Sequence, residues 1–225
     1  MSHYHLLRVF CGEDGSGGNP LAVFLDGGSV AIESRQGVAA ELGLSETVFV
    51  DDAERGEIRI FTPVVELEFA GHPTVGTAWL LAEEGSPVEV LRPPAGEVAV
   101  RYENGQSFVA ARPEWAPPFE WDQLSSADEI DALAGPPRGH DLIGAWAWTD
   151  EEAGNVRTRV FPVRLGIAED EATGAASVRL GALLGRAIDI RQGHGSRILA
   201  RPVENGYVEI GGRTVLEGVR KLSTS

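Results

Sequence analysis

Two stretches of this 225-residue chain have the composition of helices with no polar side. The first, at residues 73–82, carries Val75 and Trp79 among alanines and leucines that cover every face of a helix. The second, "ATGAASVRLGALL" at 172–184, has Arg179 as its one charged residue. Because a helix that is apolar all round must be buried on all sides, the chain has to provide a wrapping around each of them.

The rest of the chain supplies mostly strands. A surface helix is predicted at 33–43, where Gly43 is the stop signal. Runs that alternate or are rich in β-formers, separated by Gly, Pro, Asn and Asp, indicate strands at 4–10, 21–25, 47–50, 57–61, 88–91, 97–102, 107–111, 143–148, 156–161, 197–200 and 207–210. We therefore expect an α+β fold with two lobes, each a mostly antiparallel or mixed, barrel-like curved sheet wrapped around a central buried helix.

The starts of the two apolar helices match each other. His72 stands four residues before Gly76 in "HPTVGTA", and Asp170 stands four residues before Gly174 in "DEATGAA". His72 and Asp170 are 98 positions apart, almost half of the chain, which indicates an internal duplication. The predicted organisation is a first lobe at 1–111 with its central helix at 73–84, a connection at 112–141, a shortened second lobe at 142–212 with its central helix at 172–185, and a C-terminal segment at 213–225 that returns to the first lobe.

The connection is rich in Pro, Asp and Trp, and it contains one recognisable helix start. In "SSADEIDAL", Ser126 is a suitable N-cap and Glu129 completes a capping box.

Composition excludes several classes of function. The net charge is −15, from 34 acidic and 19 basic residues, which argues against nucleic-acid binding and means that an anionic ligand needs a local attractor. The apolar runs are too short for a membrane span, and "MSHYHLLRVF" has no secretory signal pattern, so a cytoplasmic protein is expected. Cys11 is the only cysteine, and no residues have metal-ligand spacing, so neither a two-thiol mechanism nor a metal site is expected.

The two helix N-termini can supply the missing attractor. The first backbone N–H groups of a helix lack intrahelical partners, and the helix dipole favours an anion there. Gly71 permits close approach to the backbone, and the second helix offers the same at Thr173, Gly174 and Ala175. Two such ends facing each other would hold a small carboxylic acid without a basic residue.

Three ionisable residues are candidates for chemistry. His72 and Asp170 stand at the two helix starts, where they either contact a ligand or only cap the helices. Glu46 shares strand parity with Leu44 and Val48, so its carboxyl lies on an apolar face, where desolvation raises its pKa towards neutrality. The alternative is an edge glutamate that reaches water.

The Gly-rich stretch "GGNPLAVFLDGG" at 17–28 lacks the spacing of a dinucleotide or phosphate loop. Within it, Asn19 either donates a hydrogen bond to a ligand or caps the turn.

Five stretches together resemble one family: "GNPLAVF", "LSETVFV", "FAGHPTVGTAWLL", "RVFPVRLGIAEDEATGAA" and "IRQGHGSRI". Their order and approximate spacing are similar to those of the PhzF-like proteins of phenazine biosynthesis, from the N-terminus to about Gly212. The resemblance implies the diaminopimelate-epimerase-like fold and a homodimeric isomerase. It also implies that the enzyme moves a proton on a small cyclic or unsaturated carboxylic acid without a metal or an organic cofactor.

The same resemblance implies roles for individual residues. Glu46 corresponds to the proton-transferring acid/base, and His72 and Asp170 correspond to polar catalytic groups beside the substrate. The substrate-binding positions are Asn19, Gly71, Thr173, Gly174, Ala175 and Gln192.

The chain departs from the family pattern at three places. Glu171 replaces a proline, Ala175 replaces a serine, and the stretch from Ala111 to Val156 is short. These departures leave open a binding or interaction protein on the same fold that has lost its chemistry. An amino-acid epimerase is a weaker alternative, because those relatives carry cysteines at both helix starts and this chain has neither.

Overall fold

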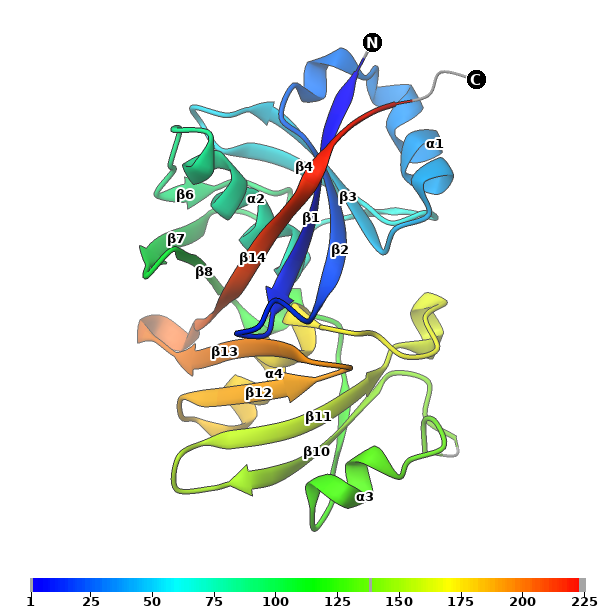
Figure 1. The fold of residues 1–225 in the computed structure, drawn as a ribbon, viewed down its shortest axis with the longest axis vertical. Coiled ribbons are helices and arrows are strands. Elements are labelled where there is room, and N and C mark those ends of the chain that lie inside the picture. Colours follow the sequence, from blue (N-terminus) through cyan, green and yellow to red (C-terminus); the bar gives the residue numbers. More distant parts are fainter. Residues whose placement is uncertain (1, 138, 223–225) are drawn as a thin grey trace.

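The computed structural model describes residues 2–137 and 139–222. Met1, Arg138 of the predicted connection and residues 223–225 of the predicted C-terminal segment lie outside the described residues. The chain folds into two lobes, one above the other in Figure 1, each with one central helix. These helices are α2 (Gly71–Glu83) and α4 (Gly174–Leu184), and two further helices, α1 (Ile32–Leu42) and α3 (Ala127–Asp131), lie outside the sheet. The predicted fold class is therefore confirmed, with the central helices displaced by one or two residues.

The strands form one continuous sheet that passes through both lobes. They are β1 (His3–Cys11), β2 (Gly17–Phe24), β3 (Glu46–Asp52), β4 (Glu57–Phe61), β5 (Glu66–Leu67), β6 (Val90–Leu91), β7 (Val98–Glu103), β8 (Gln106–Ala111), β9 (Glu120–Gln123), β10 (Ile143–Asp150), β11 (Asn155–Phe161), β12 (Ile188–Gln192), β13 (Ser196–Pro202) and β14 (Val208–Lys221). Their order is β5-β4-β3-β2-β1-β14-β13-β12-β11-β10-β9, and β6 and β7 join it through β8, which pairs with β14.

The two lobes repeat the same succession of elements. In the first, β2 and β3 are parallel and joined by α1, the antiparallel β4 and the two-residue β5 follow, and the chain then enters α2. In the second, β9 and β10 are parallel and joined by α3, the antiparallel β11 follows, and the chain enters α4. This matched order is the one that an internal duplication would produce. Within the predicted connection at 112–141, β9 pairs with β10 and α3 packs on β10, so both lie with the second lobe.

The central helices differ in how completely they are covered. Every residue of α2 from Gly71 to Ala78 is buried, as an apolar helix inside a curved sheet should be. In α4 the expectation of burial on all sides is wrong at the C-terminal end, where Ala182 is exposed and the Leu183 side chain is 59% exposed. The second lobe is the smaller one, with β9 half as long as β2, and its sheet does not reach around this last turn.

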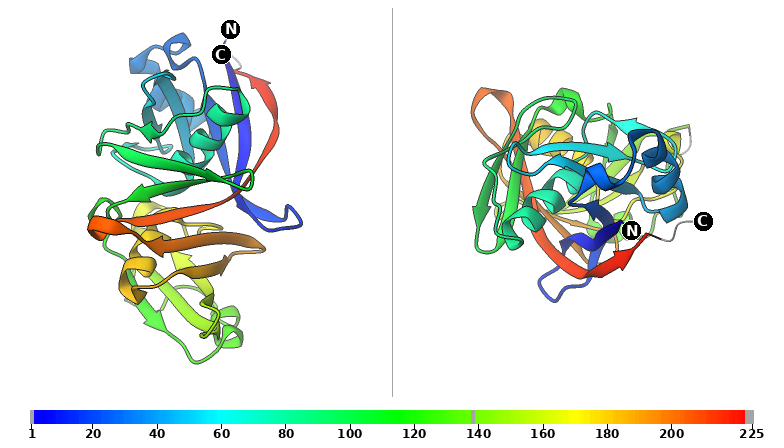
Figure 2. Two further views of the ribbon diagram at one scale, coloured as in Figure 1. Left: turned by 90° about the vertical axis from the view of Figure 1, so that its left-hand side faces the viewer. Right: turned by 90° about the horizontal axis from the view of Figure 1, so that it is seen from above.

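Strand β14 joins the two lobes (Figures 1 and 2). Its first residues pair with β13 on one side and β8 on the other. Residues from Arg213 onwards pair with β1, ending with Lys221 opposite His3. The boundary expected between residues 212 and 213 therefore falls inside a single strand, and the described part of the predicted C-terminal segment lies against the first lobe.

Two local predictions can be checked at helix ends. Gly43 ends α1 in the left-handed conformation, with φ of 63°, as predicted. Ser126 caps α3 by accepting a hydrogen bond from the Glu129 N–H at 3.3 Å, but the Glu129 carboxylate accepts from the N–H of Ser125 rather than of Ser126. Among the described residues, no helix is both long and apolar enough to span a membrane.

Candidate active site

The three predicted catalytic residues come from different elements and meet between the lobes. Glu46 is the first residue of β3, His72 is the second residue of α2, and Asp170 lies between β11 and α4. The Asp170 N–H donates to the Val160 carbonyl at 3.0 Å, which fixes the segment before α4 against β11. The His72 Nε2 and Glu46 Oε2 atoms are 3.3 Å apart.

The N-termini of α2 and α4 contact each other backbone to backbone. A Cβ atom on Gly71 would lie 2.8 Å from the Gly174 Cα, and one on Gly174 would lie 2.9 Å from the His72 nitrogen. Within the described residues, neither helix has a side-chain cap or an acidic residue in its first turn. The uncapped N–H groups of two helices therefore converge at one place, which is a suitable environment for a carboxylate.

Burial perturbs the titration of the first two residues. The side chains of Glu46 and His72 are 14% and 5% exposed. Desolvation raises the pKa of Glu46 to about 7, although a hydrogen bond from Ser45 opposes this. Desolvation lowers the pKa of His72 to about 4, against the opposing effects of the Asp170 charge and a hydrogen bond to the Pro20 carbonyl. At neutral pH, His72 is an uncharged imidazole.

Glu46 and His72 together accommodate one proton. The Glu46 Oε2 and His72 Nε2 atoms are buried and have no other hydrogen-bond partner in the described part of the chain. In the neutral ring with its proton on Nδ1, Nε2 carries a lone pair. A protonated Glu46 can donate to that lone pair, whereas an ionised Glu46 faces it without a hydrogen bond. The pair can therefore share one proton, held on Glu46.

Asp170 is held by both lobes. Its Oδ1 accepts from the Asn19 Nδ2 at 2.8 Å and its Oδ2 accepts from the Thr173 Oγ1 at 2.7 Å. Desolvation first, and then the charge of Glu46, raises the pKa of Asp170, while the hydrogen bonds from Thr173 and Asn19 lower it. The two carboxyl groups thus influence each other's ionisation.

Asn19 and Gln192, both predicted to bind substrate, are engaged within the protein in this structure. Asn19 also donates to the Ala172 carbonyl at 3.1 Å, and its Oδ1 accepts from the Ser45 hydroxyl at 3.0 Å. Gln192 donates to the Asp170 carbonyl at 2.8 Å and to the Thr173 hydroxyl at 2.9 Å. Both amides frame Asp170, so we assign them to positioning it, and their direct contact with a substrate stays a prediction.

Glu171 and Ala175, the two residues near the start of α4 that depart from the family pattern, have different surroundings. The carboxylate of Glu171 points away from the helix N-terminus and is bound by the turn between β12 and β13. Ala175 is partly buried against a small apolar cluster that includes Phe119 and Leu142. Glu171 therefore does not place its charge at the proposed anion site.

Metal ligation was not expected from the sequence. In residues 2–137 and 139–222, no three His, Cys, Asp or Glu side chains gather closely enough to hold a metal ion.

A protein-family model matches the part of the chain that contains Glu46 and His72. The family model PhzC-PhzF, described as phenazine biosynthesis-like protein, matches residues 8–149. The chain belongs to the PhzC-PhzF family. The match covers the strand that carries Glu46 and the helix that carries His72. Asp170 and α4 lie beyond the matched residues.

Several curated relatives of this chain are named as isomerases. An uncharacterized isomerase of Pasteurella multocida is 42% identical over 109 residues, which is 46% of this chain and 37% of the relative. A trans-2,3-dihydro-3-hydroxyanthranilate isomerase of Pseudomonas aeruginosa is 31% identical over 238 positions, covering 88% of this chain and 85% of the relative. Since 88% of 225 residues is about 198, about 40 of those positions have no counterpart in this chain.

The solved structures confirm the fold. A phenazine biosynthesis PhzC/PhzF protein from Clostridium difficile superposes with a TM-score of 0.81 at 19% identity, with both chains covered completely. The predicted two-lobed, epimerase-like architecture is thus shared by a member with a very different sequence.

Proposed function

We propose that this protein is an isomerase that moves a proton on a small carboxylic acid, with Glu46 as general acid and base. The observation that carries the proposal is a glutamate buried beside His72 where two uncapped helix N-termini meet. Its burial raises its pKa to about 7. A group that gives and takes protons is most effective when its pKa lies near the working pH.

The proposed step needs only groups of the chain itself. Ionised Glu46 removes a proton from a substrate carbon made acidic by a neighbouring double bond or carboxyl group, and the electron pair of the broken C–H bond is delocalised. The same carboxyl group then returns the proton to a different carbon, so no atom is gained or lost. The N–H groups at the starts of α2 and α4 hold the substrate carboxylate, and His72 and Asp170 orient the substrate and stabilise the developing charge.

The proposed substrates are small cyclic or unsaturated carboxylic acids. An anion fits the N–H groups that converge at the starts of α2 and α4. The name of the Pseudomonas aeruginosa relative supplies the first compound to test, trans-2,3-dihydro-3-hydroxyanthranilate. A homodimer, implied by the family resemblance, is part of the proposal, and sedimentation velocity tests it.

The test is proton exchange with solvent. The protein is incubated in D₂O with that compound and with a panel of small cyclic and aromatic carboxylic acids, and deuterium incorporation is read by mass spectrometry. We expect incorporation by the wild type and none by Glu46→Gln, with ligand affinity largely retained. Glu54→Gln removes an exposed glutamate from the same lobe and serves as the matched control.

Two outcomes decide against the proposal. An unchanged rate in Glu46→Gln removes Glu46 from the reaction. Binding of these acids to the wild type without any deuterium incorporation favours a binding protein on the same fold, which is the alternative suggested by the missing hydroxyl at Ala175.

A further inference from the structure

The carboxylate of Glu171 is bound by residues outside the candidate active site, although the preceding residue, Asp170, belongs to that site. It accepts hydrogen bonds from the His194 N–H at 2.8 and 3.0 Å and from the Ser196 hydroxyl at 2.8 Å. A Cβ atom on Gly193 would lie 2.2 Å from the Glu171 carboxylate. The turn between β12 and β13 is therefore shaped around this carboxylate, and only glycine fits beside it.

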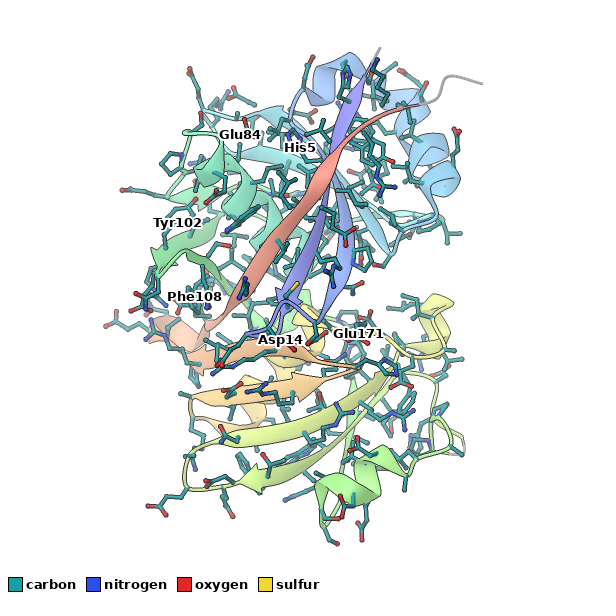
Figure 3. The ribbon with its side chains drawn as sticks, viewed as in Figure 1. His5, Asp14, Glu84, Tyr102, Phe108 and Glu171 are labelled. Carbon is teal, nitrogen blue, oxygen red and sulfur yellow. The ribbon has the colours of Figure 1, made fainter. Side chains whose placement is uncertain are left out.

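Ser196 carries the contact into the first lobe. Its buried hydroxyl donates to Glu171 and accepts the N–H of Gly18, in β2, at 2.8 Å. The two backbones are in close contact here, because a Cβ atom on Gly17 would lie 2.5 Å from the Ser196 nitrogen. Figure 3 shows Glu171 near Asp14 of the β1–β2 turn, at the level where the two lobes meet. Glu171, Ser196 and Gly18 form a hydrogen-bonded bridge between the lobes.

The bridge ends next to a residue of the site. Gly18 precedes Asn19, which donates to Asp170 and accepts from Ser45, the neighbour of Glu46. We propose that Glu171 is a positioning residue, which through Ser196 and Gly18 fixes Asn19 and thereby holds Asp170 in its orientation. Its importance for catalysis rests on the function proposed above, whereas its effect on Asn19 and Asp170 is independent of any substrate.

The sign of a pKa change separates positioning from a simple charge effect. The hydrogen bond from Asn19 lowers the pKa of Asp170, so a loosened Asn19 raises that pKa. Removal of the negative charge of Glu171 would by itself lower the pKa of Asp170. Ser196→Ala breaks the bridge and changes no charge, so its effect reports positioning alone. Glu46 and His72 are the ionisable groups that face Asp170, and neither is altered in these variants.

The experiment is an NMR titration of the full chain labelled with ¹³C-aspartate, together with hydrogen exchange of the Asn19 side-chain amide. For Ser196→Ala we expect the pKa of Asp170 to rise by about half to one unit. Exchange of the Asn19 amide should accelerate about fivefold or more in both Ser196→Ala and Glu171→Ala. Ser34→Ala, an exposed serine on α1, is the matched control and should change neither quantity.

Several results overturn the proposal. One is an unchanged or lowered pKa of Asp170 in Ser196→Ala when the remaining spectrum shows a folded protein. Another is faster exchange of Asn19 in Ser196→Ala without an effect of Glu171→Ala, since Ser196 would then act alone.

Steady-state kinetics test whether the bridge matters for catalysis. With an active substrate, kcat of Ser196→Ala should fall about three- to tenfold while KM changes less, because the substrate carboxylate is held elsewhere. A wild type that is inactive on every compound refutes the proposed function, and the titration then still decides whether Glu171 positions Asn19. Normal kcat together with a raised pKa of Asp170 refutes the catalytic importance of the bridge.

Discussion

Replacing Glu46 with glutamine should stabilise the protein while it abolishes turnover. Burial raises the pKa of Glu46 from 4.5 to about 7, so the folded protein resists ionisation that the unfolded chain allows. An acid with a raised pKa lowers the free energy of unfolding as pH rises from 4.5 through about 7. A difference of about 2.5 units corresponds to roughly 3 kcal/mol at pH 8, at 1.36 kcal/mol per unit. Glutamine has a similar shape and no such cost.

The pH dependence identifies the cause. The unfolding free energies of Glu46→Gln and wild type should be nearly equal at pH 4.5 and should diverge to roughly 3 kcal/mol at pH 8. His72 acts in the opposite direction, because its lowered pKa destabilises the fold as pH falls from 6.5 through about 4. The two contributions nearly cancel between about pH 4.5 and 6.5 in the wild type, whereas in Glu46→Gln the stability should rise with pH across this window.

The assay is urea denaturation at half-unit steps from pH 4.5 to 8 for wild type, Glu46→Gln and Glu54→Gln. The exposed control should stay within about 0.5 kcal/mol of wild type throughout. A difference between Glu46→Gln and wild type that does not vary with pH refutes the assigned burial of the charge. A variant less stable than wild type at pH 8 does so as well. The expected combination, a more stable and inactive protein, is the usual mark of a residue kept for function at the expense of stability.

Two further substitutions probe how the lobes meet. Asn19→Asp replaces the amide that donates to Asp170 with a second carboxylate, so the free energy of unfolding should fall by about 1–3 kcal/mol, more at pH 8 than at pH 5. Thermal denaturation at the two pH values measures this loss, and equal losses at both would argue against charge repulsion. Gly174→Ala places a methyl group against the backbone of Gly71 and His72, so deuterium incorporation should fall by about 100-fold with the fold retained. The control Gly37→Ala, at an exposed position in α1, should stabilise the protein by about 0.5–1 kcal/mol and leave the rate unchanged. A normal rate in Gly174→Ala would show that the contact between the helices is unimportant.

The sequence predicts those parts of the molecule whose cause is local. The body of α2 could be identified because its residues are apolar on every face, and α1 because Gly43 ends it. Glu46 could be placed on an inner face because Val48 and Val50 share its parity and lie in the core. The duplication was visible because both repeats keep the same start to the central helix.

Features that depend on distant partners could not be predicted in this way. β9 lacks a clear alternation and is defined by its pairing with β10. β12 alternates only over Ile188–Gln192, and it is defined as a strand by pairing with β11 and β13. Ser45 and Ser196 gave no signal, although both bridge to residues that surround Asp170. Ser196 and its partner Gly18 are 178 positions apart, and no local pattern connects them.

The exposed end of α4 is a further case. The composition of the helix predicts burial, but the extent of burial depends on how far the neighbouring sheet extends. The chain provides too few strand residues in the second lobe to cover Leu183.

The path of β14 also determines when the fold can be completed. β1 is made long before one of its two neighbours in the sheet, β14, with His3 opposite Lys221. Contacts between such distant residues form slowly, since a long loop must close before they contribute. The first lobe therefore lacks a strand until the C-terminal residues are available. A deletion of either strand would leave an open sheet edge on the other, a site for pairing with another chain. The pairing of β1 with β14 therefore makes the two lobes a single folding unit.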